Sequence, residues 1–332
     1  MDQSKYILTI AIPTYNRSKN INKLLELLYN ETVNYRNSIK VIVSNNNSTD
    51  DTIDILTKYS LMWPDLNIIN HAKNIGSDKN FSYCFDLCVS EYFWLIGDDD
   101  LPAIGSIKLI MDVISKNSAD IIYMKSDWRD NIYDECSMRE ISKVTYSVVN
   151  DRLFFARLVN IWLTFISGCI VNKSKILLNN NNFKSDAYLW STINQMSWIC
   201  PALKCGDTFI IIDQKIIYAS KNNTSGYSAL KTFGVNLPLI LKIEFENMTY
   251  LIDAIIRHMI PSFLTTLIWK SAISTRGNDN THFNNQYWIA IKNNFNDYYI
   301  FRALCIPTYY LPKFIGLPFV ILGKIISKLN KS

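Results

Sequence analysis

The strongest constraint on the fold is a regular alternation of short apolar runs with helical patterns over the first hundred residues. The apolar runs end in polar residues within the segments 6–16, 39–52, 66–76 and 92–100. Helical patterns lie between them, at 20–30, around Ile53 to Leu56 and at 78–90. Strands that alternate with helices at this spacing predict an α/β fold with a doubly wound, mostly parallel sheet flanked by helices.

Beyond residue 120 the pattern is less regular. The sequence predicts, in order, a strand at 120–124, a polar segment at 125–150, a helix at 152–165, a strand at 167–174 and a helix at 187–198. From about residue 230 the pattern indicates helices and an amphipathic tail. We therefore predict two regions, 1–228 and 229–332, of which the second is a helical C-terminal extension.

Three adjacent aspartates, Asp98, Asp99 and Asp100, follow the apolar run that begins at Tyr92. Carboxylates at the end of a buried strand repel one another and are costly unless a cation neutralises them. One interpretation is therefore a metal site at the carboxyl edge of the sheet, where doubly wound folds bind ligands. The other is a solvated turn and helix N-cap, with Pro102 in the first turn of a helix that begins near Ile104.

Composition narrows the class of protein. The net charge of +5 is modest and no basic tract exceeds two residues, which argues against nucleic acid as a partner and leaves anionic lipid surfaces open. The seven cysteines show no CxxC spacing and no secretory signal is visible, so we expect a reducing cytoplasmic compartment. No window reaches the roughly 18 apolar residues of a spanning helix, and the apolar segments 251–269 and 314–329 are expected to be core or interfacial helices.

Four motifs together resemble glycosyltransferase family 2. They are TIAIPTYNR, VIVSNNNSTDDT, NIGSDKNFSYCF and YFWLIGDDD, and they occur in the family's order and spacing. The resemblance is strong over residues 5–120 and weaker over 120–215. It implies a GT-A fold for the region 1–228, which would transfer a sugar from a nucleotide diphosphate donor.

The resemblance also implies roles for individual residues. Asp100 would be a ligand of Mg²⁺ or Mn²⁺, Asp98 a ribose contact and second metal ligand, and the strand's alternation would place these two on the same side. A divalent cation offsets the charge that develops on the departing nucleoside diphosphate. The remaining expected contacts of the nucleotide sugar are Pro13, Thr14, Tyr15, Asn16, Asn45, Asn46, Asn74, Gly76, Lys79 and Asp99.

The second motif departs from the family's usual V-D-D-G-S-T-D, because Asn45 and Asn46 stand where two aspartates are common. An asparagine offers both a donor and an acceptor, so it can pair with cytosine as well as uracil. We therefore favour a CDP- or UDP-sugar as the donor. The alternative is a simple Asn-rich turn.

The catalytic base is less clearly marked, because no acidic E-D pair follows Gly168. Asp186 lies at a suitable distance along the chain to deprotonate an acceptor hydroxyl, and Asp127 and Asp213 are reserves. Asp186 could instead cap the helix predicted at 187–198. Three tryptophans could stack on sugar faces or simply pack in the core: Trp128, Trp190 and Trp198.

The family's processive Q-x-x-R-W signature is absent, which favours transfer of a single sugar. The chain is most similar to bacterial members that build O-antigen or capsule on a polyprenyl-diphosphate-linked oligosaccharide at the inner face of the cytoplasmic membrane. Within these, its second motif resembles abequosyltransferase-like members. The segment 309–332 joins apolar residues to Lys313, Lys324, Lys328 and Lys331, as a peripheral membrane helix does, although a packed helix has the same pattern.

Two other functions remain open at this point. The missing E-D pair fits a non-catalytic relative that binds a glycan or a nucleotide. Paired aspartates on a similar sheet also bind Mg²⁺ in nucleotidyltransferases.

Overall fold

The computed structural model describes residues 6–130, 132, 141, 145–221, 227–274, 285–311 and 313–329. Contacts divide the chain into two compact units, with the main break before Ser225. The first unit holds the sheet, and the second comprises Ser225–Ser332 together with the short segments Ala156–Ile161 and Ser191–Ile193. The functional boundary predicted after residue 228 stays a prediction, because this division reflects contacts alone.

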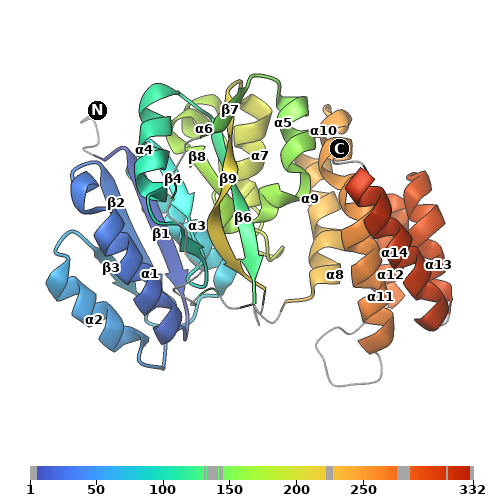
Figure 1. Cartoon of the computed structure of the whole chain (residues 1–332), viewed down its shortest axis with the longest axis horizontal. Helices are drawn as coiled ribbons and strands as arrows, with labels where there is room; N and C mark the ends of the chain where they lie inside the picture. Colours follow the sequence, from blue (N-terminus) through green and yellow to red (C-terminus); the bar gives the residue numbers. More distant parts are fainter. Residues whose placement is uncertain are drawn as a thin grey trace. The chain divides into compact units, whose positions relative to one another are not determined.

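The first four strands confirm the predicted parallel, doubly wound arrangement. They lie in the order β3 (Asn67–Asn70), β2 (Ile39–Asn45), β1 (Leu8–Thr14) and β4 (Tyr92–Leu95), and every neighbouring pair is parallel. The helices α1 (Ser18–Glu31) and α2 (Thr52–Met62) pack together, whereas α3 (Ser77–Asp86) packs on β1, β2 and β4. Right-handed crossovers place α3 on the opposite face because the strand order reverses after β3 (Figure 1).

The other half of the sheet is mixed. β8 (Cys169–Asn172) is antiparallel to β4 and to β6 (Ile121–Arg129), and β9 (Phe209–Ser220) is parallel to β6. The short strands β5 (Leu101–Pro102) and β7 (Tyr146–Val149) are antiparallel to β9. The helices of this half are α4 (Ser106–Lys116), α5 (Arg152–Val159), α6 (Lys173–Asn179) and α7 (Met196–Cys205).

Three predicted boundaries in this half are wrong. The segment 125–150, for which no strand was predicted, contains the end of β6 at Arg129 and all of β7, and residues 131, 133–140 and 142–144 of it lie outside the described residues. The helix predicted at 152–165 ends at Val159, where Asn160 takes a left-handed backbone with φ of 47°. The helix predicted at 187–198 begins only at Met196, because the left-handed Thr192 interrupts it with φ of 64°.

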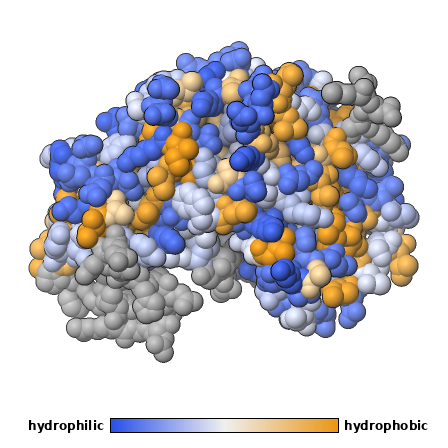
Figure 2. Space-filling model, turned by 180° about the vertical axis from the view of Figure 1, so that it is seen from behind, coloured by the Kyte–Doolittle hydropathy of each residue, from blue (hydrophilic) through white to orange (hydrophobic). Residues whose placement is uncertain are grey.

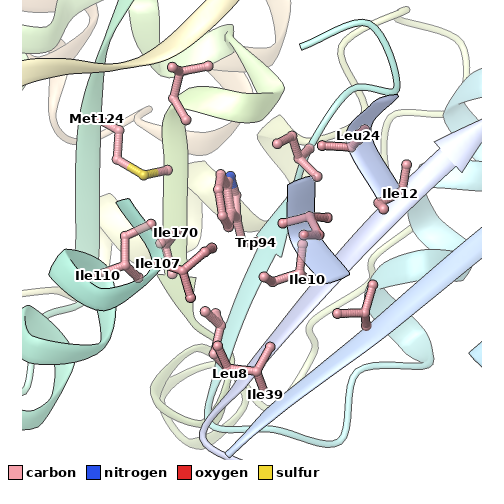
Figure 3. Packing of buried hydrophobic residues seen from close by; sticks show 14 of the residues in the cluster. Leu8, Ile10, Ile12, Leu24, Ile39, Trp94, Ile107, Ile110, Met124 and Ile170 are labelled. Carbon is pink, nitrogen blue, oxygen red and sulfur yellow. The ribbon is translucent and has the colours of Figure 1, made fainter. Parts of the chain in front are cut away.

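The core lies where β1 meets α1 and the neighbouring strands (Figure 3). All seven residues of β1 are buried, as expected for a central strand with helices on both faces. Side chains of β1 and α1 meet there with Trp94 of β4, and α4 adds Ile107 and Ile110. Trp94 also donates a 3.0 Å hydrogen bond from Nε1 to the Ser167 carbonyl, which ties β4 to the segment before β8.

The second unit is helical in its described residues, as predicted. Its helices are α8 (Ala229–Lys231), α9 (Leu237–Glu244), α10 (Thr249–Ile256), α11 (Thr265–Ser274), α12 (Asn285–Phe295), α13 (Ile306–Tyr310) and α14 (Lys313–Leu329). None of the described helices alone has the length and apolar composition to cross a membrane, although the bent pair Thr249–Ile256 and Ile260–Ser271 meets that test together. Hydrophobic residues on the face in Figure 2 form separate patches between hydrophilic ones.

Candidate active site

The three aspartates lie in a tight turn just beyond β4. The strand ends at Leu95, and the Asp100 amide donates to the Gly97 carbonyl at 3.1 Å. Asp99 and Asp100 are 8% and 5% exposed and Asp98 is half-buried, so the turn is largely shielded from solvent. The capping alternative is also wrong, because α4 begins after Gly105 without a side-chain cap and Pro102 belongs to β5.

Two of these carboxylates are held by the end of β1 and the loop that follows it. Thr14 Oγ1 donates to Asp98 Oδ2 at 2.7 Å, and the Arg17 guanidinium forms a 3.2 Å ion pair with Asp99 Oδ2. Thr14 was among the predicted contacts of the nucleotide sugar. Arg17 was not assigned a role from the sequence, although it ends the motif TIAIPTYNR.

Asp100 is anchored from the other half of the sheet. Ser167 Oγ donates to its Oδ2 at 2.5 Å, and the Ser220 amide donates to its Oδ1 at 3.4 Å. The Gly97 amide donates to Ser167 Oγ at 2.9 Å, so one buried serine links the turn and the carboxylate. The alternation argument does not apply here, because the strand stops before Asp98.

The electrostatics of this cluster favour a bound cation. Burial, together with the neighbouring Asp99 carboxylate, raises the pKa of Asp98 to about 7 and that of Asp100 to about 8. Gly97 leaves room for the carboxylates, because a Cβ there would lie 3.1 Å from both Asp99 Oδ1 and Asp100 Oδ2. Buried oxygens that resist ionisation without a counter-charge are the hard ligands that suit Mg²⁺ or Mn²⁺.

The described residues contain no group of three or more His, Cys, Asp or Glu side chains arranged to hold a metal. A divalent cation such as Mg²⁺ can be bound through only one or two protein carboxylates, with substrate phosphates and water completing its coordination. Asp100, with Asp98 beside it in the turn, would be the protein's contribution.

The loops after β1 and β2 are joined by hydrogen bonds. Asn16 has a left-handed backbone with φ of 52°, and its Oδ1 accepts from the Thr49 amide at 2.7 Å. The Asn16 amide donates to Ser48 Oγ at 2.9 Å. Pro13 is the next-to-last residue of β1 and pairs with Ser44 of β2, and Tyr15 is 43% exposed.

Asp50 joins the starts of two helices, a role that the sequence did not reveal. Its carboxylate accepts from the Ser18 amide at 3.1 Å, and from the Thr52 amide and Oγ1 at 3.1 and 2.5 Å. These hydrogen bonds lower the pKa of Asp50 although burial opposes them. Neither Asn16 nor Ser18 caps α1 with its side chain.

Asn45 is fully buried at the end of β2. Its Oδ1 accepts from the Ser48 amide at 3.1 Å and from Ser48 Oγ at 2.6 Å, and its Nδ2 donates to Asn70 Oδ1 at 2.8 Å. The side chain therefore shapes the loop. Recognition of a nucleotide base by Asn45 stays a prediction.

Asn46 links the loop after β2 to the start of α3. Its Nδ2 donates to Asn74 Oδ1 at 3.0 Å, and its Oδ1 accepts from the Ile75 amide at 2.8 Å. Gly76 precedes α3 with φ of 86°, a backbone that glycine adopts without strain. Asn74, Gly76 and Lys79 are exposed around this helix start, at the carboxyl edge where the sequence placed them.

The predicted bases occupy different surroundings. Asp186 is exposed in the turn 185–190, and it caps no helix because α7 begins ten residues later. Asp127 on β6 forms ion pairs with Arg129 at 2.9 Å and Lys215 at 3.0 Å. Its pKa is lowered because these hydrogen bonds and charges outweigh desolvation, which weakens Asp127 as a base. Asp213 pairs with Lys125 at 3.2 Å.

A groove of about 400 Å³ lies at the opposite edge of the sheet, lined by residues that include Ile7, Glu91 and Asn117. The carboxylates, the asparagines and the joined loops all lie at the carboxyl edge, where the arrowheads of β1 and β6 point in Figure 1. The polar and acidic residues therefore favour the carboxyl edge, and not this groove, as the candidate active site.

The fold and this acidic edge define a sugar-transferring enzyme of the GT-A type. The chain belongs to glycosyl transferase family 2, whose model matches residues 9–177. It is 29% identical over 117 residues to the abequosyltransferase RfbV of Salmonella typhimurium, a match that covers 35% of this chain and 34% of that protein. It is also 30% identical over 112 residues to the chondroitin synthase of Escherichia coli, covering 33% of this chain and 16% of the synthase. These matches thus span about a third or less of the curated relatives.

Solved structures resemble the chain over nearly its whole length. Residues 1–349 of Staphylococcus aureus TarS in complex with UDP-GlcNAc align with a TM-score of 0.58 at 16% identity, covering 97% of this chain and 92% of that one. The mannosyltransferase PcManGT of Pyrobaculum calidifontis, in complex with GDP-Man and Mn²⁺, gives 0.51 at 14% identity, covering 100% and 91%. At these identities the likeness confirms the GT-A fold.

Proposed function

We propose that this glycosyltransferase moves a single sugar from a nucleoside diphosphate donor to a hydroxyl of a lipid-linked surface oligosaccharide, at the inner face of the cytoplasmic membrane. The observation that carries the proposal is the buried Asp98–Asp100 turn, anchored by Thr14, Arg17 and Ser167. The relatives in bacterial polysaccharide assembly support the acceptor class. The carboxylates suit Mg²⁺ or Mn²⁺, and a CDP- or UDP-sugar is the favoured donor.

In this mechanism the chain's residues position the donor and move one proton. Asp100 and Asp98 would hold Mg²⁺ or Mn²⁺, and such a cation would supply positive charge that offsets the charge developing on the departing nucleoside diphosphate. Arg17 stays paired with Asp99, which limits repulsion within the turn. The acceptor hydroxyl oxygen bonds to the sugar's anomeric carbon as the bond to the diphosphate breaks, and Asp186 takes the hydroxyl proton.

The first experiment is a thermal-shift panel of nucleoside diphosphates and their sugars with Mn²⁺ or Mg²⁺. A ligand at 100 times its Kd stabilises the folded state by about 2.7 kcal/mol, which gives a clear shift. We expect a metal-dependent shift that Asp100→Asn abolishes. Asp112→Asn, which changes an exposed carboxylate on α4, should keep it. A panel without any shift would overturn the donor site. A shift with UDP but not with CDP would exclude the CDP-sugar.

The proposed membrane contact is supported by α14. Small residues of this helix, Gly316 and Gly323, face the second unit's interior, where a Cβ at Gly323 would collide with Pro261. The helix nevertheless exposes apolar side chains on its other side, beside exposed Lys324 and Lys328. These exposed residues are Ile315, Leu317, Ile321, Leu322, Ile325 and Leu329.

Vesicle co-sedimentation tests this contact without removing the packed helix. Leu322→Glu combined with Ile325→Glu should release the protein from vesicles that contain phosphatidylglycerol. Leu61→Glu is the matched control, because Leu61 is an 81% exposed leucine on α2. Equal binding of the double variant and the control would refute the contact.

A further inference from the structure

We propose that Trp128, Trp162 and Phe165 form a stacking platform for a pyranose ring of the acceptor glycan. This inference rests on the proposed function. The three side chains are called the aromatic platform below. A sugar presents an apolar face of C–H groups, and a flat aromatic surface is its natural partner.

The rings lie together. The Trp128 ring centroid is 5.7 Å from that of Trp162 and 4.9 Å from that of Phe165, with interplanar angles of 39° and 49°. Trp162 is 38% exposed, and the other two are half-buried. The rings are tilted against one another, and Trp162 is the most exposed of the three, so its face is the one most open to a sugar. Trp198, another tryptophan singled out from the sequence, is instead 2% exposed and stacks on Phe85 in the core.

The platform adjoins the aspartate turn through both groups that anchor Asp100. Ser167, which donates to Asp100, lies two residues after Phe165. Ser220, which donates to the other Asp100 oxygen, follows Ala219, the partner of Trp128 across β6 and β9. Any ring seated on the platform would thus lie beside the carboxylate proposed to hold the cation.

The strand order places the platform away from the expected nucleotide contacts. The loops after β1 and β2 lie on one side of β4, whereas β8 and β6 lie on the other. The aspartate turn after β4 stands between them. A donor nucleotide on the first side and an acceptor sugar on the second would meet at this turn, which is the geometry that transfer requires.

Polar groups next to the rings also lack partners within the described part of the chain. Ser126 Oγ is buried without a hydrogen bond, and Ser126 shares a strand face with Trp128. Gln195 is 4% exposed; its Nε2 donates to the Thr164 carbonyl at 2.5 Å, and its Oε1 has no partner among these residues.

The test measures binding to a printed array of bacterial surface oligosaccharides in the presence of Mn²⁺ and UDP or CDP. We expect Trp162→Ala and Trp128→Ala to weaken the wild-type glycan signal about tenfold, and Trp162→Phe to restore most of it. Tyr250→Ala is the matched control, because Tyr250 is a 44% exposed aromatic residue on α10, where no site is proposed.

Nucleotide binding is measured on the same proteins by thermal shift, so that the two proposals fail separately. A retained nucleotide shift with a lost glycan signal supports the platform. Unchanged glycan binding in both alanine variants would overturn it, and so would a wild type that binds nucleotide but no glycan. Loss of nucleotide binding in these variants would place the rings in the donor site, and this result would also overturn the platform. A wild type that binds no nucleotide contradicts the proposed function itself.

Discussion

Ser167 offers a sharp test of how the aspartate turn is built. Ser167 is fully buried. Its Oγ donates to Asp100 at 2.5 Å and accepts from the Gly97 amide at 2.9 Å. Ser167→Ala removes both hydrogen bonds and adds no bulk. The change leaves a buried amide and a buried carboxylate each short of one partner.

The expected cost follows from these two bonds. A buried amide without a partner costs about 1–3 kcal/mol, and a hydrogen bond between neutral groups contributes about 0.5–1.5 kcal/mol. The second range applies because the raised pKa leaves the Asp100 carboxyl mostly protonated at pH 7 without a cation. Because the two losses share one site, we expect the free energy of unfolding to fall by about 3 kcal/mol. Since the Ser167 hydrogen bond lowers the pKa of Asp100, its loss should also favour the protonated carboxyl and weaken Mn²⁺-dependent nucleotide binding about tenfold.

Ser185→Ala is the matched control. Ser185 is also buried and donates to a carboxylate, Asp86, at 2.7 Å, with Ser82 as its second partner at 2.9 Å. Urea unfolding should show similar losses of stability in both variants, while calorimetry should show weaker Mn²⁺–nucleotide binding only in Ser167→Ala. Equal binding in the two variants would mean that Ser167 is merely a core serine.

Three further changes test the surrounding structure. Lys173→Met should lower the free energy of unfolding by about 3 kcal/mol, because the buried Nζ donates to backbone carbonyls at the end of α3. The same change at the exposed Lys184 should not lower it, and urea unfolding of the two variants tests the difference. Asp50→Ala should cost about 1–2 kcal/mol through two helix starts, and Asp51→Ala less, since Asp51 makes no side-chain cap; thermal unfolding compares them. Because the pKa of Asp100 is raised to about 8, Mn²⁺ must displace a proton from this carboxyl below that pH. The Mn²⁺ affinity measured by calorimetry should therefore fall about tenfold for each pH unit below 8, and an affinity that does not change with pH would contradict this.

The parallel half of the sheet was predictable because the apolar pattern of each of its strands can be recognised from neighbouring residues in the sequence. Helices cover both faces of β1, so the strand is apolar throughout and stands out in the sequence. The Asp98–Asp100 cluster was found for the same reason, since three carboxylates after a buried strand are unusual wherever the fold places them.

The mixed half was harder to predict. The second half of β6, from Lys125 to Arg129, is half-exposed and polar, so its composition indicated a loop. The stretch 187–198 has helical spacing, but Asn194 Oδ1 accepts from the Tyr188 amide at 3.1 Å and holds a turn in place of the helix. Both errors arise where particular hydrogen bonds, between β6 and β9 in one case and between Tyr188 and Asn194 in the other, outweigh helix or loop propensity.

The partners of the aspartates depend on strand order, which the sequence pattern left unassigned. β8 runs antiparallel to β4, so the start of β8 lies beside the end of β4, and Ser167 therefore meets Asp100. β9 runs parallel to β6 and ends at the same edge, where its last residue, Ser220, donates to the other Asp100 oxygen. A parallel β8 would start at the opposite edge of the sheet and leave that carboxylate without its serine. The antiparallel strand is thus what completes the site that the parallel strands begin.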